Sequence, residues 1–149
     1  MKKMTRWGVG PKFGILTLLY SALPYLITTY IFPSWKFSGF SVIGVCLIVV
    51  GCILFIYPAV TIDKYFNNKQ LRTRGLYAYV RHPIYAAWIV IIIPGIVLYW
   101  GAFLGLTIPF VAYWIFKQFI HVEEDYLLTL FGDQYRRYRH NVNAVFPKF

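Results

Sequence analysis

The sequence predicts an all-α integral membrane protein with about four transmembrane helices. Its 149 residues are 59% hydrophobic and only 13% charged, whereas about a quarter of the residues in a soluble domain are charged. The mean hydropathy is +0.58, and the apolar residues gather in long runs without the alternating polarity of membrane β-strands. This composition excludes a disordered chain, a nucleic-acid-binding domain and an ordinary soluble enzyme.

Four runs are each long enough to cross the roughly 30 Å of membrane hydrocarbon as a helix. We expect spans at about residues 13–32, 40–62, 83–100 and 102–119, within a single domain that covers residues 1–149. Pro24 should kink the first span, and Gly101 should form the turn between the last two. The first run follows basic residues, as in a signal peptide, but it is too long for one. We therefore expect it to remain as an anchor.

The distribution of positive charge predicts the orientation of the chain. Of the fifteen Lys and Arg residues, fourteen lie in residues 1–12, 64–81 and 117–149, and only Lys36 lies between the first two spans. The positive-inside rule then places both termini and the central loop in the cytoplasm. We expect a multi-pass protein of the cell's inner (cytoplasmic) membrane, and the partner of its basic surface is anionic lipid rather than nucleic acid.

Two polar stretches are too long to be simple connections. One runs from Asp63 to His82, and the other is the tail from His121 to Phe149. Both are cytoplasmic in this topology, so they can meet. We expect a site where they do, at the membrane interface.

The central stretch ends at the start of the third span. Pro83 suits the first turn of that helix, which places His82 at or next to the N-cap and Tyr85 one turn further on. The free N–H groups and the positive end of the helix dipole could hold a carboxylate there. The alternative is a basic and aromatic belt at the membrane interface, without a ligand.

A helical projection of residues 116–131 distinguishes two neighbouring carboxylates. Glu123 falls at the centre of an apolar stripe, and Glu124 falls at its edge; the stripe comprises Phe116, Phe119, Ile120, Leu127 and Leu130. A carboxylate on such a face is costly unless it is paired, which makes it a candidate functional group. The alternative is an ion pair between Glu123 and a loop arginine. One nearby histidine is too few for a transition-metal site, so we expect no metal.

Three motifs together resemble the isoprenylcysteine carboxyl methyltransferase family and the wider group of small membrane methyltransferases that includes phospholipid N-methyltransferases. They are GLYAYVRHPIY at residues 75–85, EEDYL at residues 123–127 and FGDQYRRY at residues 131–138. The resemblance covers about residues 69–147. It implies an enzyme that uses S-adenosylmethionine as methyl donor, releases S-adenosylhomocysteine and methylates a lipid or another lipophilic small molecule. The C-terminal helix and tail would help to form the cofactor site.

The resemblance also implies which residues bind the cofactor: Lys69, Gln70, Leu71, Arg72, Tyr77, His82, Pro83, Ile84, Tyr85 and Glu123. The helical projection independently indicates the last of these residues, Glu123. Isoprenylcysteine members carry a substrate-binding arginine four residues before that glutamate, and Phe119 stands there in this sequence. We therefore expect a neutral or amine-bearing acceptor to be methylated better than a prenylcysteine carboxylate. Candidate substrate-binding residues are Arg81, Phe119 and Glu124. Neither a catalytic base nor an oligomeric state follows from the sequence.

Two other classes of protein remain open. NADPH-dependent sterol and steroid reductases are similar in membrane fold and in their C-terminal segment. A non-enzymatic membrane subunit would leave Glu123 paired and would lack a cofactor-sized cavity. The two adjacent glutamates and the short chain favour the methyltransferase.

Overall fold

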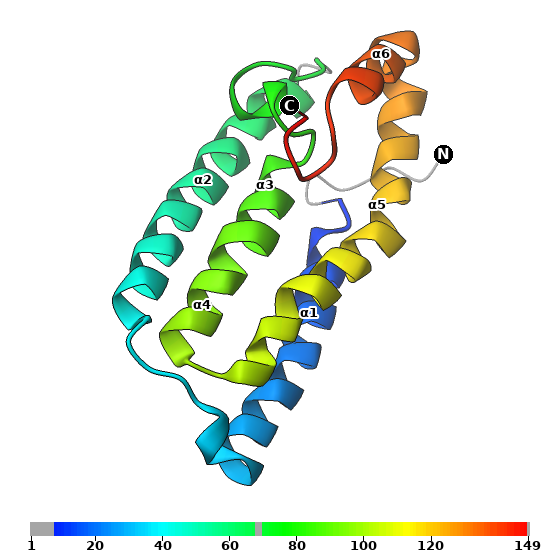
Figure 1. Ribbon diagram of the computed structural model, residues 1–149. Helices are drawn as coiled ribbons and strands as arrows, with labels where there is room; N and C mark the ends of the chain where they lie inside the picture. Colours follow the sequence, from blue (N-terminus) through cyan, green and yellow to red (C-terminus); the bar gives the residue numbers. More distant parts are fainter. Residues whose placement is uncertain (1–7, 68–69, 149) are drawn as a thin grey trace.

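The computed structural model describes residues 8–67 and 70–148, and these form a helical bundle (Figure 1). Helix α1 spans Gly10–Leu26 and continues as a π-helical segment, Ile27–Ile31. Helix α2 spans Ser41–Asn67. The third membrane helix comprises α3 (Pro83–Ala86), a π-helical segment (Ala87–Ile92) and α4 (Ile93–Trp100). Helix α5 spans Ile108–Phe131, and α6 spans Asp133–Asn141.

Short 3-10 turns at Pro33–Trp35, Gly75–Ala78 and Phe103–Thr107 complete the described elements. In the described part of the chain, β-pairing is limited to two isolated bridges, Lys36 with Ala102 and Val80 with Asn143.

Within residues 8–67 and 70–148, four helical segments are long and apolar enough to cross a membrane: Gly10–Ile31, Ser41–Ile62, Pro83–Trp100 and Phe103–Phe131. They confirm the predicted all-α membrane architecture and match the first three predicted spans closely. The fourth predicted span overlaps the segment Phe103–Phe131, and α5 continues without a break to Phe131, so it includes the helix that the projection of residues 116–131 assumes. Polar residues such as Lys117 do not end this helix, since they lie exposed on its surface. Glu123 and Glu124 are therefore carried on the last turns of a membrane helix.

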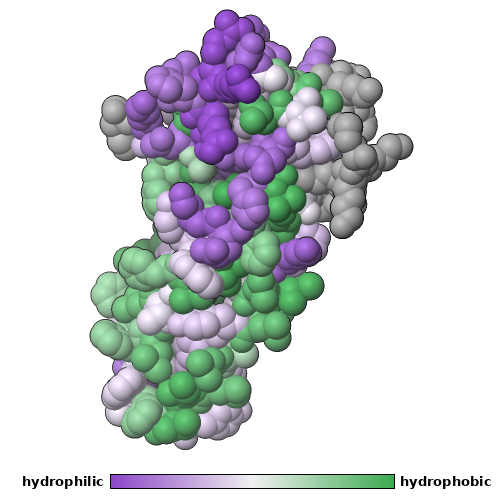
Figure 2. Space-filling model, turned by 90° about the vertical axis from the view of Figure 1, so that its right-hand side faces the viewer, coloured by the Kyte–Doolittle hydropathy of each residue, from purple (hydrophilic) through white to green (hydrophobic). Residues whose placement is uncertain are grey.

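Helix α2 packs along α3 and α4, and α1 packs against α5 (Figure 1). The buried core lies mainly between α1, the third membrane helix and α5, and includes Phe13, Ile89, Ile93, Val97 and Phe116. Many large apolar side chains of α1 and α2 face outward, as lipid-facing residues do, for example Leu18, Leu19 and Ile53. Figure 2 shows one side of the molecule, where the apolar (green) surface covers mainly the end away from α6 and hydrophilic residues gather at the end that carries α6.

Gly101 makes the predicted turn between the last two spans. Its φ is 71°, and a Cβ there would overlap the carbonyl oxygen of Phe37. The N–H of Phe37 donates to the carbonyl of Gly101 at 2.7 Å. A glycine is needed both for this backbone angle and for the close approach of the two connections.

At the opposite end, the chain after α6 returns beside the start of α3 (Figure 1). The backbone N–H of Arg81 donates to the carbonyl of Asn143 at 2.8 Å, and that of His82 donates to Ala144 at 3.0 Å. Val145 is buried in the core. The central loop and the tail therefore meet, as the sequence predicts.

Candidate functional site

A cavity of about 460 Å³ lies where the central loop, the N-terminal segment, α2, α5 and α6 come together. Small-molecule sites typically measure about 300–1,000 Å³. Nine of the ten residues that the resemblance implies as cofactor contacts line it: Gln70, Leu71, Arg72, Tyr77, His82, Pro83, Ile84, Tyr85 and Glu123. The tenth, Lys69, lies outside the described residues. Segments far apart in sequence thus converge on one cavity.

His82 is the N-cap of α3 and Pro83 its first residue, as predicted. The imidazole is buried, with Nε2 3.3 Å from Oε1 of Glu124 and Nδ1 3.7 Å from Oε1 of Glu123. Burial by itself lowers the pKa of His82, but the two carboxylates outweigh it and raise the pKa above its ordinary value. The ring is therefore an imidazolium over a wider pH range than a free histidine.

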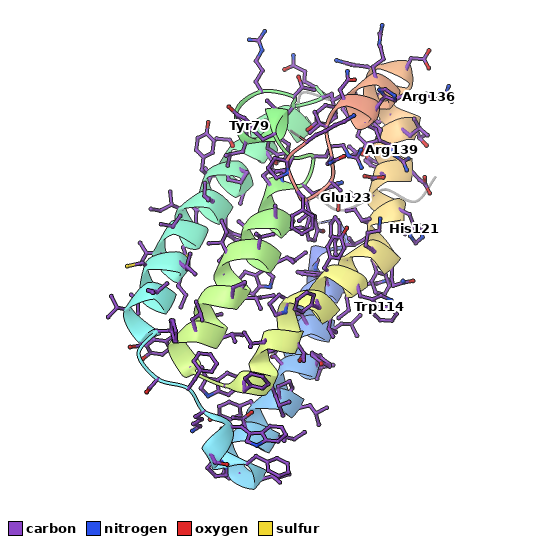
Figure 3. All side chains as sticks on the ribbon, viewed as in Figure 1. Tyr79, Trp114, His121, Glu123, Arg136 and Arg139 are labelled. Atoms are coloured by element: carbon purple, nitrogen blue, oxygen red, sulfur yellow. The ribbon has the colours of Figure 1, made fainter. Side chains whose placement is uncertain are left out.

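Glu123 lies at the wall of the cavity, on the inner side of α5 (Figure 3). Its side chain is 19% exposed, and Oε2 accepts a hydrogen bond from the Tyr85 hydroxyl at 3.2 Å. His121 and Trp114 of the same helix are exposed on its outer side. The structure thus places the carboxylate of Glu123 where a ligand in the cavity can reach it.

Glu124 is the more deeply buried of the two glutamates, although the projection places Glu123 nearer the centre of the apolar stripe. It is 5% exposed, and it is not among the residues that line the cavity. The helical projection used only the neighbours of Glu124 on its own helix, whereas its partners come from elsewhere. Arg81 Nη2 lies 2.5 Å from Oε1, and Arg139 Nε lies 3.3 Å from Oε2. The ion pair considered for Glu123 is therefore made by Glu124.

The other two candidate substrate-binding residues, Arg81 and Phe119, differ in whether they line the cavity. Arg81 lines the cavity, and its Nη1 also donates to the carbonyl oxygens of Arg139 at 2.7 Å and Val142 at 3.0 Å. Phe119 is half-buried, packs against the hydrophobic core and does not appear among the lining residues of the cavity. Of the three candidates, Arg81 alone lies at the cavity wall.

Arg72 and Tyr77 form a further part of the wall. The Arg72 guanidinium is buried, donates to the Thr61 hydroxyl and lies 4.9 Å from the centre of the Tyr77 ring. Burial raises the pKa of Tyr77 above its ordinary value, so the phenol remains neutral. The Tyr77 carbonyl accepts a hydrogen bond from the Tyr138 hydroxyl at 2.6 Å, which ties this turn to α6.

Several residues that line the cavity are not among those predicted from the sequence. They are Gly8, Gly10, Pro11, Phe13 and Gly14 at the N-terminus, Phe55, Ala59 and Ile62 on α2, Trp88, and Tyr126, Leu127, Leu130, Phe131, Tyr135 and Tyr138 near the C-terminus. Two signals were available in the sequence. Three glycines lie within residues 8–14, and two tyrosines three residues apart interrupt the otherwise polar helix α6.

Gly8 is the clearest of these residues, because its backbone passes directly against Glu123. Its φ is 52°, and a Cβ there would overlap the Glu123 carboxylate. A side chain at this position would therefore either displace Glu123 or push the N-terminal segment away from the cavity.

The cavity combines one carboxylate and several cationic or hydrogen-bonding groups at one side with the apolar walls of Phe13, Phe55 and Trp88. Such a site suits a small molecule that carries both charges and an apolar body.

Comparisons with known proteins point in the same direction. Residues 42–129 match the model of the isoprenylcysteine carboxyl methyltransferase (ICMT) family. The chain is 32% identical over 146 residues to a protein-S-isoprenylcysteine O-methyltransferase of Tribolium castaneum, covering 85% of this chain and 49% of the relative. A protein-S-isoprenylcysteine O-methyltransferase of Dictyostelium discoideum is 30% identical over 146 residues, covering 92% of this chain and 61% of the relative.

A solved structure is also similar, that of the eukaryotic intramembrane Ras methyltransferase ICMT. The TM-score is 0.67 at 29% identity, with 92% of this chain and 52% of the other covered. The chain therefore spans about half to three fifths of the length of these similar proteins.

Proposed function

Because the chain belongs to the isoprenylcysteine carboxyl methyltransferase family, we propose that it is a membrane enzyme that methylates a lipophilic acceptor, with S-adenosylmethionine as the methyl donor. When bound, the donor supplies an electrophilic methyl group on a sulfonium. The residues of this chain bind and orient the donor and acceptor, and orientation alone is worth up to roughly 7–11 kcal/mol in favourable reactions.

The observation that carries the proposal is the convergence of nine implied cofactor residues on one cavity. The donor presents an ammonium, a carboxylate and a sulfonium, and the cavity offers groups for each. Glu123 suits the ammonium. The cationic groups near the start of α3 suit the carboxylate. The aromatic faces of Tyr77 and Tyr85 suit a sulfonium, which carries a positive charge.

The acceptor would arrive from the bilayer. Apolar residues of α1 and α2, among them Phe13, Phe55 and Ala59, line one side of the cavity. The outer faces of the same two helices carry many exposed large apolar side chains. A lipophilic molecule can therefore enter without first dissolving in water. Phe119 stands where the resemblance implies a substrate-binding arginine, and it packs against the core outside the cavity wall, so the proposal of a neutral or amine-bearing acceptor rests on the resemblance.

A transfer assay tests this function. Purified protein in lipid nanodiscs is incubated with S-adenosylmethionine labelled in its methyl group and with either a lipophilic amine or N-acetyl-farnesylcysteine. We expect label in the organic phase that depends on the protein, with more label in the amine than in the farnesylcysteine. Efficient labelling of farnesylcysteine alone would contradict the expected acceptor but not the methyltransferase. Label in neither class would contradict the function.

We further propose that both termini and the central loop face the cytoplasm of a cell with this protein in its inner membrane. The support is the distribution of Lys and Arg along the sequence, together with the hydrophilic residues that gather at the end that carries α6 (Figure 2). Single-cysteine reporters, in a background without Cys46 and Cys52, test the orientation. An impermeant reagent added outside intact cells should label a reporter at Ser34 and not one at Lys148. The opposite pattern would contradict the proposed orientation.

A further inference from the structure

Two buried polar atoms on residues of the cavity wall have no hydrogen-bond partner among the residues that the structure describes. They are Nε of Arg81 and the hydroxyl of Tyr135. Both residues line the cavity, and Tyr135 is 0% exposed. Buried donors are nearly always paired in folded proteins, because an unmade hydrogen bond costs free energy. Two such donors on residues of one cavity therefore point to a bound group that accepts from both.

The two side chains belong to one electrostatic cluster. Burial raises the pKa of Tyr135 above its ordinary value, Glu124 raises it further, and Arg81 acts in the opposite direction. The phenol therefore keeps its proton near neutral pH and remains a donor. Within the described chain, the other guanidinium nitrogens of Arg81 are already engaged, Nη2 by Glu124 and Nη1 by two backbone carbonyls.

The charge balance of this cluster favours a negatively charged ligand. The side chains of Arg81, Arg139 and His82 surround the carboxylates of Glu123 and Glu124. With His82 protonated, three positive charges face two negative ones, which leaves a net charge of +1. A carboxylate bound beside Arg81 would face a cation there, and ionised groups are tolerated at buried sites when they are paired.

We propose that Arg81 Nε and the Tyr135 hydroxyl form a carboxylate subsite of the cavity. This inference rests on the proposed function, which supplies two possible carboxylates, one on the methyl donor and one on a prenylcysteine acceptor. The neighbouring Glu123 decides between them. An amino acid carries its ammonium and its carboxylate on one carbon, so Glu123 and the subsite together complement the amino-acid end of the donor.

Tyr138 provides a matched control. It lies one turn after Tyr135 on α6, also lines the cavity and has its ring centre 6.2 Å away. Its hydroxyl is already satisfied, because it donates to the Tyr77 carbonyl. Replacing each tyrosine by phenylalanine removes one hydroxyl in both cases, but only Tyr135→Phe removes a donor that has no partner among the described residues.

The experiment is isothermal titration of the full-length protein with S-adenosylhomocysteine and with its decarboxylated analogue, which lacks only the carboxylate. Wild type should bind the first compound about tenfold or more tightly than the second. Tyr135→Phe should lose that preference, with affinity for the analogue unchanged. The unfolding temperature without ligand should not fall, since no described bond is lost. Tyr138→Phe should lower the unfolding temperature and keep the preference.

Several results would overturn the inference. Tyr135→Phe could weaken the binding of both compounds equally, or it could weaken the binding of neither. It could instead raise the KM for N-acetyl-farnesylcysteine without changing donor affinity, which would assign the subsite to the acceptor. Wild-type protein that binds neither compound would contradict the proposed function itself, and the subsite with it. Binding by wild type with an unchanged preference in Tyr135→Phe would contradict the subsite alone.

Discussion

Arg81 and Glu124 form an ion pair across 43 residues of sequence, with Nη2 of the arginine 2.5 Å from Oε1 of the glutamate. Their side chains are only 10% and 6% exposed. His82 and Arg139 contact the same carboxylate. Glu124 thereby joins the start of α3, the end of α5 and helix α6 around the cavity. It positions the residues that line the site rather than lining it itself.

We predict that Glu124→Gln strongly destabilises the protein. The substitution leaves buried cations without their counterion, and breaking a buried pair costs about 3–5 kcal/mol. Thermal unfolding in detergent, followed by circular dichroism, measures the loss. The control is Asp133→Asn, because Asp133 pairs with Arg136 where both side chains are more than two-thirds exposed, at 83% and 71%. This control should change stability little. Equal effects of the two substitutions would contradict the role of Glu124.

Glu123→Gln should weaken the binding of S-adenosylhomocysteine by about tenfold or more. This is the loss of affinity expected when one hydrogen bond between charged groups is removed. Glu123 lines the cavity, whereas Asp125 on the same helix is exposed. Asp125→Asn is therefore the matched control, and titration calorimetry should show little change for it. A small effect of equal size for both variants would argue against Glu123 as a ligand-binding residue.

The raised pKa of His82 predicts a specific pH dependence of stability. Protonated His82 contributes to the folded state fully below its unfolded pKa, near 6.5. That contribution is lost as the pH rises through the higher pKa of the folded protein. The unfolding temperature should therefore fall as the pH is raised above neutrality. In His82→Gln the fall should be smaller, and an identical pH profile in this variant would disprove the assignment.

Gly8→Ala should weaken S-adenosylhomocysteine binding several-fold. A left-handed alanine costs about 1–2 kcal/mol, and its Cβ would overlap the Glu123 carboxylate. Gly14→Ala is the control, since Gly14 also lines the cavity and a Cβ there meets no atom within 4 Å. If Gly14→Ala weakens binding as much as Gly8→Ala does, contact between Gly8 and Glu123 is not the cause.

Local features of the sequence were enough to predict much of the fold. Apolar runs and their breaks at Pro33 and Gly101 located the membrane helices, because a membrane helix satisfies its backbone within a single segment. Pro83 predicted the start of α3 and placed His82 at its N-cap, because proline favours the first turn of a helix. The helix that the projection assumes over residues 116–131 is the last part of α5, which continues beyond the predicted membrane span because exposed polar residues do not end a helix.

The site was only partly predictable, because its contacts are long-range. The position of Glu123 at the cavity followed from its apolar neighbours on one helix. The burial of Glu124 did not, because Arg81 and Arg139 reach it from other segments. The approach of Gly8 to Glu123 joins the two ends of the chain, and no spacing within the sequence encodes that distance.

The central claim is that the cavity binds the methyl donor, and titration of wild-type protein with S-adenosylhomocysteine and with NADPH tests it most directly. The cavity lined by Glu123, His82 and Tyr85 predicts saturable binding of S-adenosylhomocysteine with one site per chain and no measurable binding of NADPH. Competition by S-adenosylmethionine should follow. Binding of NADPH without binding of S-adenosylhomocysteine would contradict the claim and identify the cavity as a reductase site.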